Sequence, residues 1–160
     1  IVAKGHHFPL LTCVVVLDAD LGLDGGDLRA NERAFQLLQQ VSGRAGRAER
    51  PGTVLMQTHC ANNFLFQNLA SNDRESFLAH EIALREEHRW PPFARLAAIV
   101  IGGREHHRVE AAAQEIRKKS PQVDGVEIFG PAPAPLAKLK GEHRVRLLVR
   151  SPRTFKLQSY

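Results

Sequence analysis

Several residue types that would define a class of protein are scarce in this chain of 160 residues. It has two cysteines, Cys13 and Cys60, which are too few for a disulfide framework and do not have Cys-x-x-Cys spacing. Few cysteines are typical of a reducing compartment. No apolar run reaches the roughly 18 residues needed to cross a bilayer, so we expect no membrane partner. The chain has neither a secretory signal nor an initial methionine, and we expect it to be a part of a longer protein.

Positive charge is concentrated near the C-terminus of an otherwise ordinary globular composition. Hydrophobic residues make up 43% of the chain and charged residues 24%, and the formal net charge is +5. Residues 138–156 include seven basic residues and one acidic residue, whereas the rest of the chain has 15 basic and 16 acidic residues. This local excess is typical of a surface that docks nucleic acid or another polyanion. The alternative is an edge strand that lysine and arginine keep soluble.

The basic segment is expected to lie on a strand. Residues 144–150 alternate charged and apolar side chains, which predicts a half-exposed strand with Arg144, Arg146 and Arg150 pointing outward. Phosphate contacts from such residues would make binding fall steeply with salt. The candidate nucleic-acid-binding residues are Lys138, Lys140, Arg144 and Arg146.

The first part of the chain has the pattern of an α/β domain. The expected elements are a strand at 12–17, a helix from 31 to just before 51, and a strand at 53–58. The first strand is continuously apolar, as in sheets that are covered on both faces. The helix would bury a stripe formed by Phe35, Leu38 and Val41. Strand, helix and strand in this order are typical of a piece of a doubly wound α/β domain.

The second part has the pattern of a small α+β unit. Helices are expected at 64–70, 74–88 and 105–119, and strands at 95–101, 126–129 and 144–150. The proline-rich residues 130–135 are expected to form a stiff, extended connection. Trp90 and Phe93 flank two prolines, and we expect this aromatic pair to pack under a domain rather than stack on a base.

The most informative segment is the octet at residues 40–47, which reads Gln-Val-Ser-Gly-Arg-Ala-Gly-Arg. On a helix its polar side chains would have the spacing i, i+4 and i+7 and share one face. The residues on that face are Gln40, Arg44 and Arg47. Two guanidinium groups on one face can hold an oxyanion, and Gly43 and Gly46 leave room for a backbone or a phosphate. The simpler alternative is a solvated basic turn.

The octet resembles the last conserved motif of superfamily 2 helicases, which lies on the second RecA-like lobe and faces the nucleotide on the first lobe. The resemblance implies that Arg47 is a finger on the γ-phosphate, Arg44 a second phosphate or interlobe contact, and Gln40 a residue that positions water or phosphate. Residues 3–9 resemble the preceding helicase motif, which couples nucleotide to DNA. The coupling residues that this implies are Lys4, Gly5, His6, Gly43 and Gly46.

Several rarer segments resemble the PriA (primosomal protein N′) family, whose members restart stalled replication forks. They are Lys-Gly-His-His-Phe-Pro at 4–9, Leu-Asp-Ala-Asp-Leu-Gly-Leu at 17–23, Trp-Pro-Pro-Phe-Ala-Arg at 90–95 and Gly-Pro-Ala-Pro-Ala-Pro-Leu at 130–136. In the third segment, tryptophan stands where the family has tyrosine. The resemblance implies the C-terminal portion of a RecA-like helicase lobe over residues 1–71 and a small α+β sandwich domain that binds DNA over residues 72–160. It also implies an ATP-dependent 3′-to-5′ DNA helicase.

The cofactors implied by this resemblance are ATP and Mg, bound mainly by the first lobe. The chain has no Gly-x-x-x-x-Gly-Lys-Ser/Thr phosphate loop and no Asp-Glu-x-His motif, so we expect no ATP hydrolysis by this chain alone. The family's paired-zinc element uses eight cysteines, which implies zinc in the full-length proteins but not here. The weaker metal candidates, for which we also predict no metal, are the neighbouring pairs His6–His7, His59–Cys60 and His106–His107.

The partners that the resemblance implies are forked or single-stranded DNA, other primosome proteins and single-stranded DNA-binding protein. The implied location is the bacterial cytoplasm, in association with the nucleoid. The alternative function is a stand-alone module from about residue 72 onward, which docks branched DNA or a protein and has no catalytic activity.

Overall fold

The chain folds into two compact units in the computed structural model, Ile1–Glu81 and Ile82–Tyr160, which divide within a single helix, α3 (Arg74–Glu87). The residues that the structure describes are 10–23, 27–46 and 51–159. Within these ranges there are four α-helices, one short 3-10 helix and five strands in two sheets. The mixed α/β content confirms the coarser expectation of fold class. The domain boundary expected after residue 71 stays a prediction.

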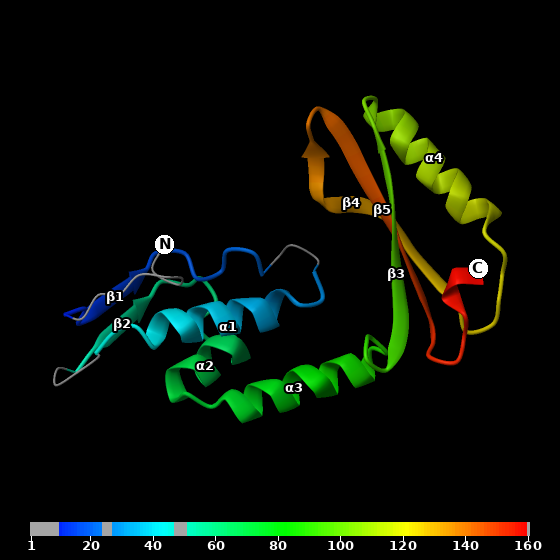
Figure 1. Ribbon diagram of the computed structural model, residues 1–160. Coiled ribbons are helices and arrows are strands. Elements are labelled where there is room, and N and C mark those ends of the chain that lie inside the picture. Colours follow the sequence, from blue (N-terminus) through cyan, green and yellow to red (C-terminus); the bar gives the residue numbers. More distant parts are fainter. Residues whose placement is uncertain (1–9, 24–26, 47–50, 160) are drawn as a thin grey trace. The chain divides into compact units, whose positions relative to one another are not determined.

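The first unit has a two-stranded parallel sheet with helices beside it (Figure 1). Strand β1 (Cys13–Val16) pairs in parallel with β2 (Thr53–Met56), and helix α1 (Ala30–Ser42) lies between them in the chain. Parallel strands need such a crossover, because a tight turn can join only antiparallel neighbours. Helix α2 (Phe64–Ser71) follows β2, and the side chain of Asn63 caps it by accepting a hydrogen bond from the backbone N–H of Leu65.

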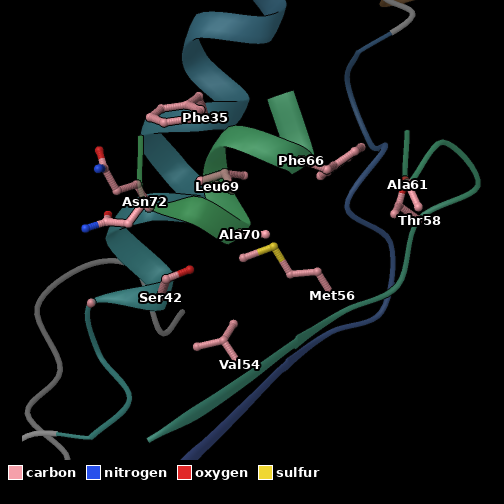
Figure 2. Close-up of a pocket in the computed structure, with 12 residues that line it drawn as sticks. Phe35, Ser42, Val54, Met56, Thr58, Ala61, Phe66, Leu69, Ala70 and Asn72 are labelled. Carbon is pink, nitrogen blue, oxygen red and sulfur yellow. The ribbon is translucent and has the colours of Figure 1, made fainter. Parts of the chain in front are cut away.

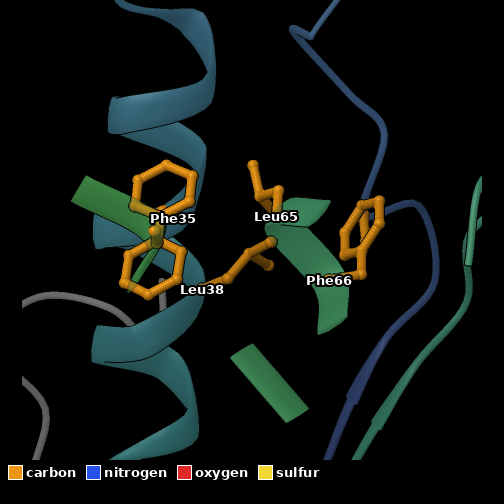
Figure 3. Packing of buried hydrophobic residues seen from close by; sticks show 6 residues of the cluster. Phe35, Leu38, Leu65 and Phe66 are labelled. Carbon is orange, nitrogen blue, oxygen red and sulfur yellow. The ribbon is translucent and has the colours of Figure 1, made fainter. Parts of the chain in front are cut away.

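The core of the first unit is built mainly by aromatic and leucine side chains from three helices. Phe35 and Leu38 of α1 pack with Leu65 and Phe66 of α2, as Figure 3 shows, and Phe77 of α3 completes the cluster. The rings of Phe35 and Phe77 are stacked, with centroids 4.0 Å apart. Burying a phenylalanine contributes roughly 1.5–3 kcal/mol. The predicted burial of Phe35 and Leu38 is therefore confirmed, and it orients α1 against α2.

The second unit is a three-stranded antiparallel sheet with one helix packed on it. The strands are β3 (Ala94–Gly103), β4 (Glu127–Leu139) and β5 (Glu142–Pro152), and the order in the sheet is β3-β5-β4. Helix α4 (His106–Lys119) lies along this sheet (Figure 1). Val145, Leu147 and Val149 of β5 are buried in alternation, and Val145 packs against α4. The predicted alternation of the central strand is therefore confirmed.

Strand β4 is longer than the strand expected at 126–129. It includes the proline-rich segment, but its pairing with β5 shifts register twice, between Phe129 and Ala132 and again between Pro133 and Lys138. Proline cannot donate to a ladder, so it is tolerated in edge strands and at irregularities of this kind. The segment expected to be only a connection is thus part of the sheet, because β4 is an edge strand.

A two-residue turn joins β4 to β5. Both of its residues, Lys140 and Gly141, have positive φ angles, 50° and 85°, and the last pair of the ladder is Leu139 with Glu142. Positive φ at both positions is the signature of the type I′ turn, whose twist matches that of the strands it connects. The turn holds Lys140 at the tip of this hairpin.

Candidate functional site

The segment expected to contact phosphate does not form one continuous helix. Helix α1 ends at Ser42, and Gly43 donates its backbone N–H to Gln39 at the helix end. Gln40 therefore lies on the exposed side of the last helical turn, whereas Arg44 lies in the turn that follows the helix. The prediction that Gln40, Arg44 and Arg47 share one face of a helix is therefore wrong, because α1 ends before Arg44. Arg47 lies outside the described residues, as do Lys4, Gly5 and His6.

Just after α1, the backbone is hydrogen-bonded to the segment that precedes β1. The N–H of Gly46 donates to the carbonyl of Leu11 at 2.9 Å, just before β1. Gly46 has a φ of +72°, and a Cβ at this position would lie only 2.3 Å from the backbone nitrogen of Gly52. Sequence reasoning allowed either a backbone or a phosphate to approach Gly46. At Gly46 the close neighbour is backbone.

Asp20 joins the ends of the two parallel strands, a role that sequence reasoning did not assign. Its carboxylate accepts hydrogen bonds from the Thr58 hydroxyl at 2.7 Å and from the His59 backbone N–H at 2.8 Å. The bond from Thr58 is the largest cause that lowers the pKa of Asp20 below its ordinary value. The available signal was the position of this acid, shortly after the first predicted strand.

The first unit also has a cavity of about 690 Å³ between α1, β2 and α2 (Figure 2). Val54 and Met56 of β2 and Leu69 of α2 contribute apolar side chains to its wall. None of the lining residues is charged. Within the part of the chain that the structure describes, the cavity therefore has no charged side chain that could pair with a phosphate.

In the second unit, two of the predicted nucleic-acid-binding residues lie at the β4–β5 hairpin. Lys140 is at the turn, and Lys138 is directly opposite His143 in the ladder. Directly opposite residues share a face of a sheet, and His143 alternates with Val145, which packs on α4. Lys138 is therefore on the α4 side of the sheet, and its side chain remains exposed.

The other two predicted residues lie on the opposite face of the sheet. Arg144 is paired with Gly102 of β3, and Arg146 with Val100. Both arginines are partly buried. The four candidates thus surround one end of the sheet instead of forming one continuous face, although Lys138 and Arg144 line the same small cavity.

Arg150 lies on the same face of β5 as Arg144 and Arg146, but its side chain is only 14% exposed instead of pointing outward as predicted. Its guanidinium forms an ion pair with Glu127 and lies over two aromatic rings, 5.1 Å from the centroid of Trp90 and 4.9 Å from that of Phe129. Arg89 pairs with the other oxygen of Glu127 at 3.1 Å. These bonds, mainly the one from Arg150, lower the pKa of Glu127 below its ordinary value. Trp90 packs in this cluster as expected, whereas Phe93, the other aromatic residue of the predicted pair, is 36% exposed.

The positive charge of the chain belongs to the second unit. This unit has fifteen lysine and arginine residues and eight acidic residues, a formal charge of +7, whereas the first unit has seven and nine, a formal charge of −2. Arg108 and Lys119 are paired with Glu105 and Glu115. Three of the four predicted nucleic-acid-binding residues form no ion pair in the part of the chain that the structure describes. They are Lys138, Lys140 and Arg144.

The described residues contain no group of three His, Cys, Asp or Glu side chains arranged to hold a metal ion. Cys13 and Cys60 are free thiols. None of the helices in the described ranges combines the length and the apolar character that crossing a bilayer requires.

Comparison with known proteins gives a consistent result over the whole chain. The family description "Primosomal protein N C-terminal domain" matches residues 86–159, which lie within the second unit. The replication restart protein PriA of Rickettsia conorii is 41% identical over 160 residues, 100% of this chain and 24% of the relative. The chain belongs to the PriA family. The resemblance found in the sequence is thereby confirmed.

More distant PriA proteins match the chain as well. The replication restart protein PriA of Haemophilus influenzae is 39% identical over 158 residues, 98% of this chain and 22% of the relative. That of Bacillus subtilis is 38% identical over 151 residues, 93% of this chain and 19% of the relative. The chain therefore spans at most about a quarter of the length of these PriA relatives.

Proposed function

We propose that this chain is part of an ATP-dependent 3′-to-5′ DNA helicase that recognises stalled or branched replication forks and restarts replication by primosome assembly. Membership of the PriA family supports this proposal. On this proposal, residues 1–71 belong to the second RecA-like lobe, and residues 72–160 form the domain that binds DNA. The partners are forked or single-stranded DNA, primosome proteins and single-stranded DNA-binding protein, in the bacterial cytoplasm at the nucleoid.

Residues in the last turn of α1 and just after it are proposed to contact a nucleotide that is held mainly by another lobe, together with Mg. Arg47 is the proposed finger on the γ-phosphate, Arg44 is a second contact, and Gln40 positions water or phosphate. The backbone of Gly52 lies where a Cβ of Gly46 would be, so a glycine is needed at this position. The proposed coupling residues are Lys4, Gly5, His6, Gly43 and Gly46.

The observation that carries the proposal of DNA binding is the distribution of charge. The second unit has a formal charge of +7, and Lys138, Lys140 and Arg144 lie around one end of its sheet with no ion pair in the described part of the chain. Cations of this kind bind phosphates and release counterions. Sequence-independent recognition of a DNA backbone needs no more specialised chemistry than this.

The test is a salt-dependent titration of labelled forked DNA, followed by fluorescence anisotropy. Binding by the 160-residue chain is expected to weaken steeply between about 50 and 200 mM salt. The triple variant Lys138→Gln, Lys140→Gln and Arg144→Gln should weaken binding. It should also reduce the slope of log affinity against log salt by about 0.9 for each phosphate contact that is lost.

A matched control removes three positive charges that already have acidic partners. The control is Arg29→Gln, Arg33→Gln and Lys119→Gln, whose side chains pair with Glu32, Asp27 and Glu115. It has the same net charge as the test variant and should bind DNA with a nearly unchanged salt slope. Equal losses in both variants would contradict the proposed surface. Binding that is absent or insensitive to salt would favour the alternative, a protein-docking module.

A further inference from the structure

A small cavity in the second unit brings together two histidines and two of the proposed DNA-binding residues. Its volume is about 320 Å³, and it lies between the start of α4 and the hairpin strands. This volume is at the lower end of the range for ligand sites, so it suits one small group. The polar residues that line it are His106 and Glu110 from α4, Lys138 from β4, and His143 and Arg144 from β5.

The two imidazole rings are neighbours, but their charged surroundings differ. Their centroids are 5.3 Å apart and their planes are nearly perpendicular, at 78°. His106 Nδ1 lies 3.8 Å from a carboxylate oxygen of Glu110. His143 is directly opposite Lys138 and is followed by Arg144. Protonation of His143 therefore adds a third positive charge beside two existing ones.

The other charged groups at this end of the unit, Glu105, Glu142 and Arg104, do not line the cavity. Glu105 lies at the start of α4, where its carboxylate is 2.9 Å from Arg108 Nε and 3.5 Å from His107 Nε2. Glu142 does not line the cavity, and its carboxylate lies beside Gly102, as the Arg144 side chain does. From β3, the residue paired with His143 is Gly103, which has no side chain, and Arg104 follows it with one more positive charge.

We infer that this cavity binds a phosphodiester group of DNA, and that protonation of His106 and His143 strengthens this binding. The inference rests on the proposed DNA binding of the second unit. With neutral imidazoles, the lining residues sum to one positive charge, and with both protonated they sum to three. Histidine is the side-chain type whose charge ordinarily changes in the physiological pH range, so DNA binding at about pH 6 and at about pH 8 can be compared. Bound phosphate favours the protonated rings, and protonated rings favour bound phosphate.

A metal site is the competing explanation for two histidines and a glutamate. These are common metal ligands. However, Lys138 and Arg144 place two positive charges on the same cavity, which opposes a cation. The described residues also contain no three-ligand group with the arrangement of a metal site. The geometry therefore favours an anion.

The experiment measures the affinity of the 160-residue chain for forked DNA that has a rhodamine label, at about pH 6 and about pH 8 and constant ionic strength. The wild-type dissociation constant should be lower at the acidic pH by on the order of tenfold, as expected when roughly one proton is taken up with the DNA. His143→Gln should lose most of this dependence on pH, because glutamine cannot take up the proton.

The matched control is His107→Gln, which changes the neighbouring histidine outside the cavity. It should retain the wild-type dependence on pH. In wild type, NMR titration of the imidazole groups should show a higher pKa for His143 with DNA bound than without it. This measurement does not depend on the stability of a variant.

Several outcomes would overturn the inference. One is a His143→Gln variant with the full wild-type pH dependence, and another is a His107→Gln variant that loses as much of it. A requirement for added Zn²⁺ would also overturn it, because the site would then hold a metal. If DNA binds without any dependence on pH, this inference fails while the proposed function stands. If no DNA binds at either pH, both fail.

Discussion

The two units differ in which side chains their sheets expose and which they bury. In the first unit, the outer face of the parallel sheet has Val15 opposite Leu55, and each is 55% exposed. In the second unit, the antiparallel sheet buries Val145, Leu147 and Val149 on one face and places arginines on the other. Antiparallel sheets commonly have one solvated face, whereas parallel sheets are usually covered on both. The antiparallel sheet thus has an amphipathic central strand, although Ile99 and Val100 of β3 are 41% and 44% exposed, whereas the parallel sheet has an apolar outer face.

The largest difference between the two cores is expected when Phe77 of the first unit is replaced. This ring is 1% exposed and is stacked on Phe35, so Phe77→Ala should lower the free energy of unfolding of the first unit by about 3–5 kcal/mol. Urea denaturation should be followed by circular dichroism and by the fluorescence of Trp90, which lies in the second unit. The fluorescence midpoint should stay unchanged, while part of the circular dichroism transition moves to lower urea.

The matched variant for this experiment is Leu147→Ala in the second unit. Leu147 is also 1% exposed, and its loss should lower the free energy of unfolding of the second unit by about 2–5 kcal/mol. This variant should move the Trp90 fluorescence transition. If either variant moves both signals equally, the two units unfold together and do not have separate cores.

The two sheet faces can be compared by replacing a valine with threonine in each sheet. Val149→Thr places a hydroxyl at a position that is 2% exposed, and should cost about 1–3 kcal/mol in the free energy of unfolding. Val15→Thr keeps the same shape at an exposed position and should change it by no more than about 0.5 kcal/mol. Urea denaturation measures both. A large loss for Val15→Thr would show that the outer face of the parallel sheet is covered in solution.

The smallest effect is expected from the ion pair of Glu127, and it depends on pH. Because the pKa of Glu127 is lowered in the folded state, its carboxylate stabilises the second unit above the ordinary glutamate pKa. That contribution is lost as the pH falls through the lowered folded-state pKa. Glu127→Gln should therefore destabilise the second unit at neutral pH and less so in acid. Thermal unfolding followed by Trp90 fluorescence measures this difference, and a loss that stays equal at both pH values would contradict it.

Much of the local structure could be predicted because it follows from side-chain periodicity. The alternation in β5 and the burial of Phe35 and Leu38 each reflect a repeat that one strand or one helix imposes. The end of α1 could not be predicted in this way, because it depends on the bond from Gly46 to Leu11, which are far apart in the sequence. The same applies to Asp20, whose partners Thr58 and His59 are supplied by the second strand's end.

The candidate sites show the same division. The sequence by itself determined the local excess of positive charge, the family motifs and the charges available for binding phosphate, because these are properties of residue types and their spacing. Tertiary structure alone decided which charges remain available. It paired Arg150 with Glu127, placed Lys138 and Arg144 on opposite faces around one cavity, and brought His106 next to His143. The physical reason is that electrostatic interactions depend on distances between atoms, and only folding determines those distances for residues that are remote in the chain.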